Sequence, residues 1–495
     1  MRARLTFARA TLAAFALGAL VPSVGFAQGT PGAGIIMPTP APMPTQGGTP
    51  LPYPAYGTPA PDVSHLTQKP GVPTVVSLAQ AVKIAVALSP VFASQNAQWA
   101  VIHAKYTSAK QALYPGVSGA GSIGNQYSNG SLNRNGGVQP SSSPGGGGLT
   151  GAGTTASESV SITIQQLIYD GGRAIAAIHS AKSSDYAGRA TLLRNLQTLA
   201  LNVANAYYAV LQNNATVIAD AQLVKEFEVS ESAVAAQIRN GAAARSDLAA
   251  AQFQTATARG NLVTAQGQAI GAQAVFATTL GLDADAEAVP KQIGNQPQLP
   301  NPAYATSLKR AFLLRPDYIA AGYTVEADKE GLRYAKLARF PVLIAGASDQ
   351  VGRSFGPFSS GYTNDKTLGL NISIPIYDQG QTNYNVAVAA ATLDAAYDAA
   401  RQSGLQVESD VRSALANLIS ARALLVQTQS ELTAAKVSLD ATQAQYRVGA
   451  TTIINVVTAE ANLATAQSDQ INSLYGVQTA QQNYLYATGT SDLQL

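Results

Sequence analysis

Two long segments of the chain carry apolar residues at every seventh position. In the second half these positions hold Val411, Leu418, Leu425, Leu432, Leu439 and Tyr446. The positions 208 residues earlier hold a similar set with one charged exception: Val203, Val210, Val217, Val224, Glu231 and Ile238. A sustained seven-residue repeat is typical of helices that pack as coiled coils. We therefore predict long helices, the first from about Arg173 to Arg239 and roughly 100 Å long.

Two shorter segments alternate with a period of two, which predicts strands that have one apolar and one polar face. The apolar positions of the first are Val160, Ile162, Ile164 and Ile168. Those of the second are Leu368, Leu370, Ile372, Ile374 and Ile376. Partner strands are expected after Pro115 and Pro341, because proline ends the incoming helix. Strands of about ten residues suit a tilted bilayer crossing, although the edge of a soluble β-sandwich has the same pattern.

The two halves of the chain also share short motifs. QLIYDGG at residues 166–172 recurs as IPIYDQG at 374–380, and RNGA at 239–242 recurs as RVGA at 447–450. Both pairs are 208 residues apart, whereas the prolines that precede the strands are 226 residues apart. The first copy therefore has 18 extra residues. They fall in a Gly/Ser/Asn-rich tract, residues 121–153, which predicts a loop.

These features divide the chain into five parts. Residues 1–27 are a predicted signal peptide, with Arg2, Arg4 and Arg9 ahead of an apolar run. The alternative, a membrane anchor, is disfavoured because the run is shorter than about 20 residues. Residues 28–73 are a Pro-rich disordered linker, either a tether or a docking segment. The first repeat spans residues 74–282, an inter-repeat linker 283–303, and the second repeat 304–491.

Composition narrows the classes of function. Only 12% of the residues are charged, against about 25% in ordinary soluble domains. Lysine and arginine exceed the acids by three, and the three leader arginines account for the excess, so we predict no nucleic-acid partner. Cysteine is absent, which excludes disulfides, thiolate catalysis, cysteine-ligated zinc and a lipid-modified amino-terminal cysteine.

No motif in the chain predicts catalytic chemistry. GAGSIG at residues 119–124 matches a dinucleotide-loop pattern, but it follows a predicted helix end and opens no helix. His65, His103 and His179 lack the spacing of metal ligands. We therefore predict no cofactor, no metal and no enzymatic activity. The exported coiled-coil structural proteins or adhesins, and more distantly a periplasmic enzyme, remain alternatives to a membrane channel.

Taken together, these features resemble the TolC-type outer-membrane efflux proteins. The resemblance covers about residues 75–492 and rests on the export signal, the tandem copies, the YDxG-type strand exits and the tips RNGAAARSDLAAAQ and RVGATTIINVVTAEANLATAQ. It implies an α+β membrane protein, a homotrimer whose twelve-stranded outer-membrane β-barrel, four strands per chain, continues into a long α-helical coiled-coil periplasmic tunnel. Barrels of this kind start at eight strands, so one chain alone cannot close one.

The resemblance also implies a function, which is the outer-membrane channel of a tripartite export system. Its partners would be a periplasmic adaptor (membrane fusion) protein and an inner-membrane transporter that delivers drugs, metals or secreted substrates. The tips would dock the adaptor, with turn chemistry alone as the alternative for the glycines: Arg239, Gly241, Tyr446, Arg447 and Gly449. The periplasmic constriction would include Arg245, Asp247, Asn455 and Thr458.

The resemblance implies two further expectations. Asn455 and Thr458 stand where relatives carry acidic rings, so we expect a nearly neutral gate. The strand residues Leu368, Leu370, Ile372, Ile374 and Ile376 would face outer-membrane lipid.

Overall fold

The computed structural model of the chain describes residues 75–128, 153–241, 243–292, 301–355 and 361–490. The predicted signal peptide, the Pro-rich linker and residues 129–152 of the predicted loop lie outside the described residues. The chain divides into two compact units, one formed by strands and one formed by helices.

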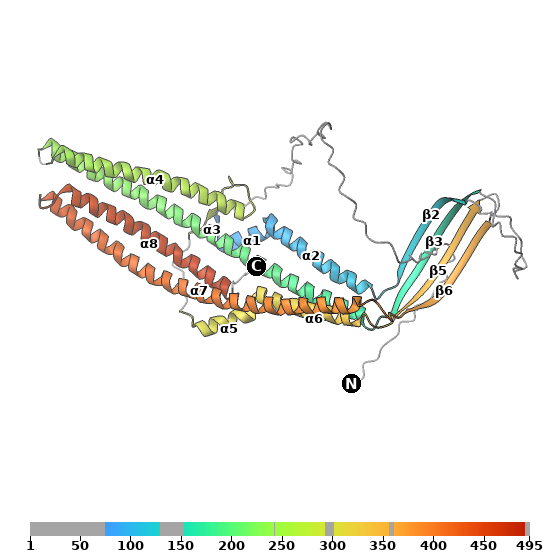
Figure 1. Ribbon diagram of the computed structural model, residues 1–495. Coiled ribbons are helices and arrows are strands. Elements are labelled where there is room, and N and C mark those ends of the chain that lie inside the picture. The colour runs from blue at the N-terminus through green and yellow to red at the C-terminus, as the bar shows by residue number, and fades with distance from the viewer. Residues whose placement is uncertain (1–74, 129–152, 242, 293–300, 356–360, 491–495) are drawn as a thin grey trace, which may run out of the picture. The chain divides into compact units, whose positions relative to one another are not determined.

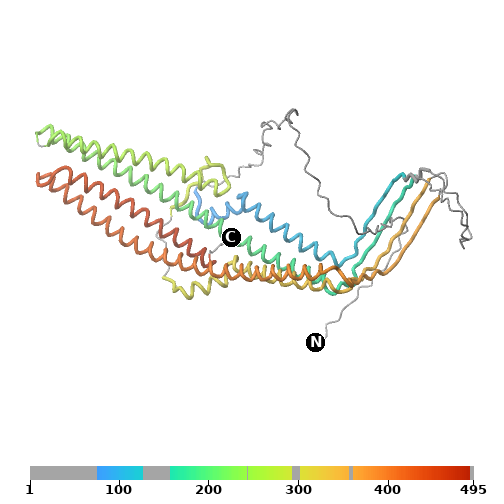
Figure 2. The backbone as a smooth tube through the Cα atoms, viewed as in Figure 1, coloured from blue at the N-terminus to red at the C-terminus, as the bar shows by residue number. Residues whose placement is uncertain are grey.

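Two helical hairpins dominate the helical unit. The first consists of α3 (Arg173–Arg239) and α4 (Arg245–Thr279), and the second of α7 (Gln381–Arg447) and α8 (Ile453–Ala487). In both, the long helix and the shorter one lie side by side and antiparallel (Figures 1 and 2). The predicted bounds of the first long helix are confirmed. The heptad positions are buried or half-buried, including Glu231.

Shorter elements complete the helical unit. In the first half they are β1 (Val75–Val76), α1 (Leu78–Leu88) and α2 (Pro90–Gln111). In the second half they are β4 (Val289–Pro290), α5 (Tyr304–Leu314) and α6 (Pro316–Leu337). α1 and α5 each have 11 residues and α2 and α6 each have 22, while the long helices have 67 residues and their partners 35.

None of the described helices is by itself both long and apolar enough to cross a membrane. One pair, α1 and α2, has the required length and composition only when taken together, and it is bent by 56°.

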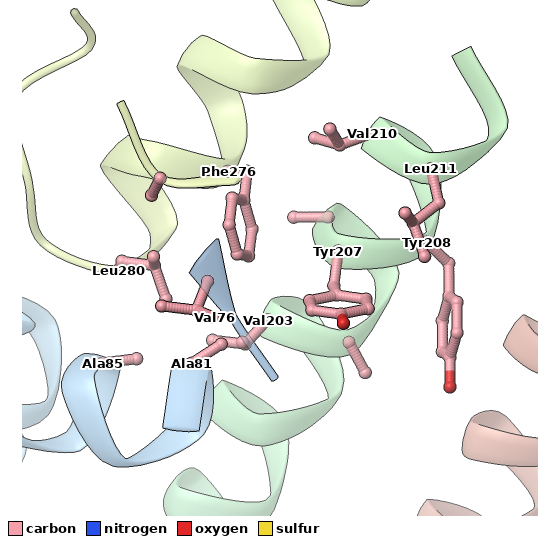
Figure 3. Close-up of a cluster of buried hydrophobic side chains, with 13 residues drawn as sticks. Val76, Ala81, Ala85, Val203, Tyr207, Tyr208, Val210, Leu211, Phe276 and Leu280 are labelled. Atoms are coloured by element: carbon pink, nitrogen blue, oxygen red, sulfur yellow. The ribbon is translucent and has the colours of Figure 1, made fainter. Parts of the chain in front are cut away.

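An apolar core anchors α1 and β1 to the first hairpin (Figure 3). Val76, Ala81 and Ala85 pack against α3 and the end of α4, where Phe276 and Leu280 are fully buried. The ring of Tyr207 lies edge-on to Phe276, and its hydroxyl donates a 2.6 Å hydrogen bond to the Lys291 carbonyl. Burial raises the pKa of Tyr207 to about 12, so the hydroxyl remains a donor. This core fixes the hairpin end that lies away from the turn.

The strand unit is a single antiparallel sheet with the order β2-β3-β5-β6 (Figure 1). Its strands are β2 (Gly116–Ser128), β3 (Gly153–Tyr169), β5 (Val342–Phe355) and β6 (Gly361–Ser373). The partner strands predicted after Pro115 and Pro341 are confirmed. β2 and β6 each have one strand neighbour within the described chain, so the sheet has two open edges.

Two details of the sequence prediction are wrong. Ile374 and Ile376 lie beyond β6, because its last residue, Ser373, pairs with Val342, the first residue of β5, and no partner remains. Pro375 also lacks the N–H that a longer ladder would use. The Gly/Ser/Asn-rich tract is not wholly a loop, since residues 121–128 and Gly153 belong to paired strands. Backbone pairing overrides the weak strand preference of these residues.

Candidate functional site

The two hairpin turns share one backbone conformation. Gly449 has a φ of +75°; its N–H donates to the Tyr446 carbonyl at 3.0 Å, and the Ala450 N–H donates to the Gln445 carbonyl at 2.9 Å. These two bonds are the Schellman pattern that ends a helix with a left-handed residue. Gly241 has a φ of +72° and donates to the Ile238 carbonyl at 3.0 Å. The predicted requirement for glycine at both turns is confirmed.

Arginine occupies the last helical position before each turn. Arg239 and Arg447 are exposed, and neither forms a salt bridge within the described residues. A cation at this position interacts favourably with the carboxyl end of the helix dipole. Their guanidinium groups therefore retain hydrogen-bond donors that a partner could use.

Asp247 has a structural role at the first turn of α4. It is half-buried, and its carboxylate accepts a 3.3 Å hydrogen bond from the Ala244 N–H and a 3.4 Å bond from the Ser246 hydroxyl. This arrangement caps the amino end of the helix, where a negative charge is stabilising. Arg245, the first residue of α4, is exposed.

Tyr446 connects the two hairpins near the turns. It packs on a core of residues from all four helices of the two hairpins, including Val234, Ala251 and Ile453. Its hydroxyl is buried without a hydrogen-bond partner in the described chain. Burial raises its pKa, and the negative charge of Asp247 raises it further. The structure thus brings Tyr446 of α7 near Asp247 of α4, a proximity that the sequence analysis did not predict.

Asn455 and Thr458 lie on an exposed face of α8. The Asn455 side-chain amide donates a 2.7 Å hydrogen bond to the Thr451 hydroxyl, and the Thr458 hydroxyl donates to the Ile454 carbonyl at 2.8 Å. Asn455 is the third residue of α8, as Asp247 is of α4. The predicted constriction residues thus lie within the first two helical turns of α4 and α8, and no ion pair joins them in the described residues.

The strand unit has one mainly apolar face, which also carries the Asp349–Lys366 ion pair and, two rows further on, Glu158 opposite Arg353. The register places Val117, Ile164, Ala347 and Leu368 in one row across all four strands, and residues opposite each other share a face. Ile372 pairs with Leu343 on the same face. The three predicted lipid-facing residues within β6 are exposed: Leu368 by 87%, Leu370 by 70% and Ile372 by 62%. Such an uncovered apolar surface marks an interaction site.

The opposite face of the sheet is polar and carries small side chains. Its rows include a hydroxyl pair from Ser122 and Ser159, and another from Ser348 and Thr367 that are 2.5 Å apart. Asp365 is the only ionisable residue on this face of β6. A sheet with one apolar and one polar face is the pattern of a membrane-spanning barrel wall.

Glu460 is a residue that the sequence analysis missed. It lies on α8 with only 3% of its surface exposed, between Val456 and Leu463. A signal was present, because the three- and four-residue steps from Ile453 to Val456, Glu460 and Leu463 place an acid in an apolar seam. Within the described residues no three side chains of the metal-ligating types are grouped to hold a metal ion.

Comparison with known proteins identifies the family. The sequence matches the family described as outer membrane efflux protein over residues 81–282 and 308–490. The outer membrane efflux protein BepC of Brucella suis biovar 1 (strain 1330) is 24% identical over 330 residues, which cover 67% of this chain and 72% of BepC. The outer membrane protein TolC of Escherichia coli (strain K12) is 26% identical over 206 residues, 39% of this chain and 42% of TolC.

Solved structures show the same fold. The outer membrane protein VceC of Vibrio cholerae aligns with a TM-score of 0.68 at 18% identity, over 83% of this chain and 96% of VceC. CusC aligns with a TM-score of 0.70 at 18% identity, over 83% of this chain and 92% of CusC. The family match confirms the resemblance, the outer-membrane location and the role in efflux predicted from the sequence. The chain therefore belongs to the outer membrane efflux protein family.

Proposed function

We propose that the chain is the outer-membrane channel of a tripartite export system and works as a homotrimer. The observation that carries this proposal is the four-stranded sheet, which has one mainly apolar face, one polar face and two open edges. Three copies supply twelve strands, and pairing β2 of one copy with β6 of the next satisfies the edges. The apolar face then contacts outer-membrane lipid and the polar face lines the pore.

The equal lengths of corresponding helices support a tandem duplication, with repeats at residues 74–282 and 304–491. Exposed apolar residues on α4 support assembly through the helices as well. Phe253, Val263 and Ile270 are about 70% exposed, and with Ala256, Gly260 and Gly267 they keep the alternating three- and four-residue spacing of a coiled-coil seam. Such a seam is stable when another helix covers it.

The hairpin turns are the proposed docking point for the periplasmic adaptor. Gly241 and Gly449 set the turns, while Arg239, Tyr446 and Arg447 flank them. Both arginines are exposed and have donors for a partner. Arg245, Asp247, Asn455 and Thr458 lie next to the turns and are the proposed constriction, where the inner-membrane transporter's substrates enter.

A matched pair of variants tests the membrane assignment. Ile372→Arg places a charge on the apolar face of β6 and should cost about 2–4 kcal/mol, which reduces insertion into the outer membrane. Asn371→Arg places the same charge on the neighbouring residue of the polar face and should insert normally. Native mass spectrometry should show a trimer of the wild-type chain, and planar-bilayer recording should show ion conduction. A stable monomer, or equal insertion defects in both variants, contradicts the proposal.

A further inference from the structure

A carboxyl group is buried where the two helical hairpins pack together. Glu460 of α8 is 3% exposed and lies beside Ser230 of α3, with which its side chain is hydrogen-bonded. Val456 and Leu463, one helical step to either side, belong to the apolar core near the turns. Ionised carboxylates are costly in such surroundings unless they are paired.

A cleft of about 640 Å³ opens beside this carboxyl, between α3, α7 and α8. Besides Glu460 itself, its charged lining comes from α3 and α7: Lys225, Glu226, Lys436 and Asp440. α4 also packs against α8, but none of its charged residues lines the cleft: Arg245, Asp247 and Arg259. Glu460 therefore lies between an apolar seam on one side and a polar cleft with two ammonium groups on the other.

The surroundings of Glu460 favour its neutral form. Burial raises the pKa of Glu460 to about 7; the hydrogen bond with Ser230 opposes this increase, and the negative charge of Glu226 adds to it. Because the pKa in the folded chain exceeds the ordinary value, the neutral form contributes its full stability at low pH. That stability falls as pH rises from the ordinary glutamate pKa to about 7, and it stays constant above.

The corresponding position of the first hairpin lacks this feature. Gln252 of α4 lies 208 residues earlier, and it is exposed and uncharged. The buried acid is thus specific to the seam that α8 makes with α3.

We propose that Glu460 is a proton-binding site that sets how tightly the α7–α8 hairpin packs against α3. Protonated Glu460 remains in the seam with Ser230. The ionised carboxylate requires water or a cation, and the cleft supplies both space and the ammonium groups of Lys225 and Lys436. Loss of the proton therefore draws the side chain toward the cleft and loosens the seam. As a regulation of the helical passage this inference rests on the proposed channel function, although the proton-linked movement itself does not.

The movement can be measured by distance between spin labels. The chain has no native cysteine, so Val229→Cys on α3 and Gln443→Cys on α7 provide the only two attachment sites in each chain, both at the cleft. Double electron–electron resonance on the purified full chain in detergent should show a longer, broader distance distribution at about pH 9 than at about pH 5. The midpoint should fall near the pKa of Glu460, about 7.

Three further variants test whether Glu460 is the group that titrates. Glu460→Gln should keep the low-pH distribution at every pH, because glutamine resembles the protonated acid. Glu226→Gln should move the midpoint to lower pH, because a like charge is removed. Glu431→Gln, on an exposed position of α7, should leave the midpoint unchanged.

A distribution that does not change with pH in the labelled wild type overturns the proposal, as does a transition that persists in Glu460→Gln. If Glu460→Gln fails to fold, Glu226→Gln still tests the proposal. An unchanged midpoint of the pH transition in that variant shows that Glu460 is not the titrating group. Bilayer conduction is recorded separately. A missing conductance with an intact pH transition counts against the channel function alone, and an intact conductance without the transition counts against this proposal alone.

Discussion

At the turn of the second hairpin, Gly449 has a φ of +75°, and no atom lies within 4 Å of the position that a Cβ would occupy. At the opposite end of the same hairpin, which we call the base, Gly489 has a φ of +70°, but a Cβ would lie 2.9 Å from the backbone nitrogen of Arg315. The first hairpin repeats this contrast between Gly241 and Gly281. The same residue type therefore serves only the local turn at one end and tertiary packing at the other.

The charged residues differ in the same way. At the base, Arg315 is 2% exposed and pairs with Asp317 at 2.6 Å and Asp410 at 2.8 Å. At the turn, Arg447 is exposed and forms no salt bridge within the described residues. The base therefore supports the fold, whereas the turn is available for contacts outside the chain. Substitutions at the two ends should consequently fail in different ways.

The largest effect is expected at the charged cluster of the base. Arg315→Ala removes one partner and leaves Asp317 and Asp410 without it, so the free energy of unfolding should fall by about 3–5 kcal/mol. Thermal unfolding of the purified protein, followed by circular dichroism at neutral pH, measures the change. The matched control is Arg259→Ala, which breaks the exposed pair with Glu228 and should cost at most about 1 kcal/mol.

The same cluster predicts a pH dependence. Burial alone would raise the pKa of Asp317, but its hydrogen bond with Arg315 and the charge of Arg194 hold the pKa below its ordinary value. The cluster thus stabilises the fold above the ordinary aspartate pKa and loses this contribution as pH falls through the lowered pKa. If Arg315→Ala and Arg259→Ala lower the free energy of unfolding at neutral pH by equal amounts, the cluster contributes little to stability.

A somewhat smaller effect is expected for Gly281→Ala at the base of the first hairpin. The added Cβ would lie 2.6 Å from the Leu88 carbonyl oxygen, and alanine is strained at a φ of +82°. The expected cost is about 2–4 kcal/mol, visible as a reduced amount of folded protein in the outer membrane.

Gly322→Ala is the control, because this exposed glycine lies within α6 with open space around it. That change should be neutral or stabilising by about 1 kcal/mol. Normal levels of Gly281→Ala would mean that the base tolerates more movement than its packing indicates.

At the turns, Gly449→Val and Gly241→Val should cost about 1–3 kcal/mol, confined to the ends of the hairpins. Protein levels in the outer membrane should stay normal, while transport and chemical crosslinking to the adaptor are lost. If both variants transport normally, or if both fail only because the protein is degraded, the turns are not the docking point.

The smallest effect on stability is expected for Asn455→Asp. This exposed change should alter the free energy of unfolding by no more than about 0.5 kcal/mol. In a trimer it places three carboxylates around the passage, so polyvalent cations should block conductance more strongly than in the wild type. A wild-type channel already blocked at low micromolar cation, and unaffected by Asp247→Asn, would place the constriction elsewhere.

The hairpins could be predicted from sequence because their information is local and repeated. The heptads and the RNGA and RVGA motifs fix where α3 and α7 end, and the turns then follow from glycine. The faces of the last part of β6 were predicted for the same reason, since alternation alone separates Leu370 from Asn371.

The features that were missed depend on contacts between distant elements. The burial of Glu460 depends on which side of α8 meets α3, and the pairing of Arg315 with Asp410 joins residues 95 positions apart. The end of β6 depends on where β5 begins, so the alternation of Ile374 and Ile376 continued past the last ladder partner.

The pairing of β3 with β5 has a consequence for biogenesis. Val160 lies opposite Val351, 191 positions later, so the two inner strands meet only after the 190 intervening residues have been made. Contacts of such sequence separation form slowly. In a newly exported chain, β3 can pair early with β2. The backbone groups on the β3 edge that faces β5 stay unpaired until the second half of the chain arrives. During that interval the chain is exposed to aggregation and proteolysis, and we expect periplasmic chaperones to bind this strand rather than the helices.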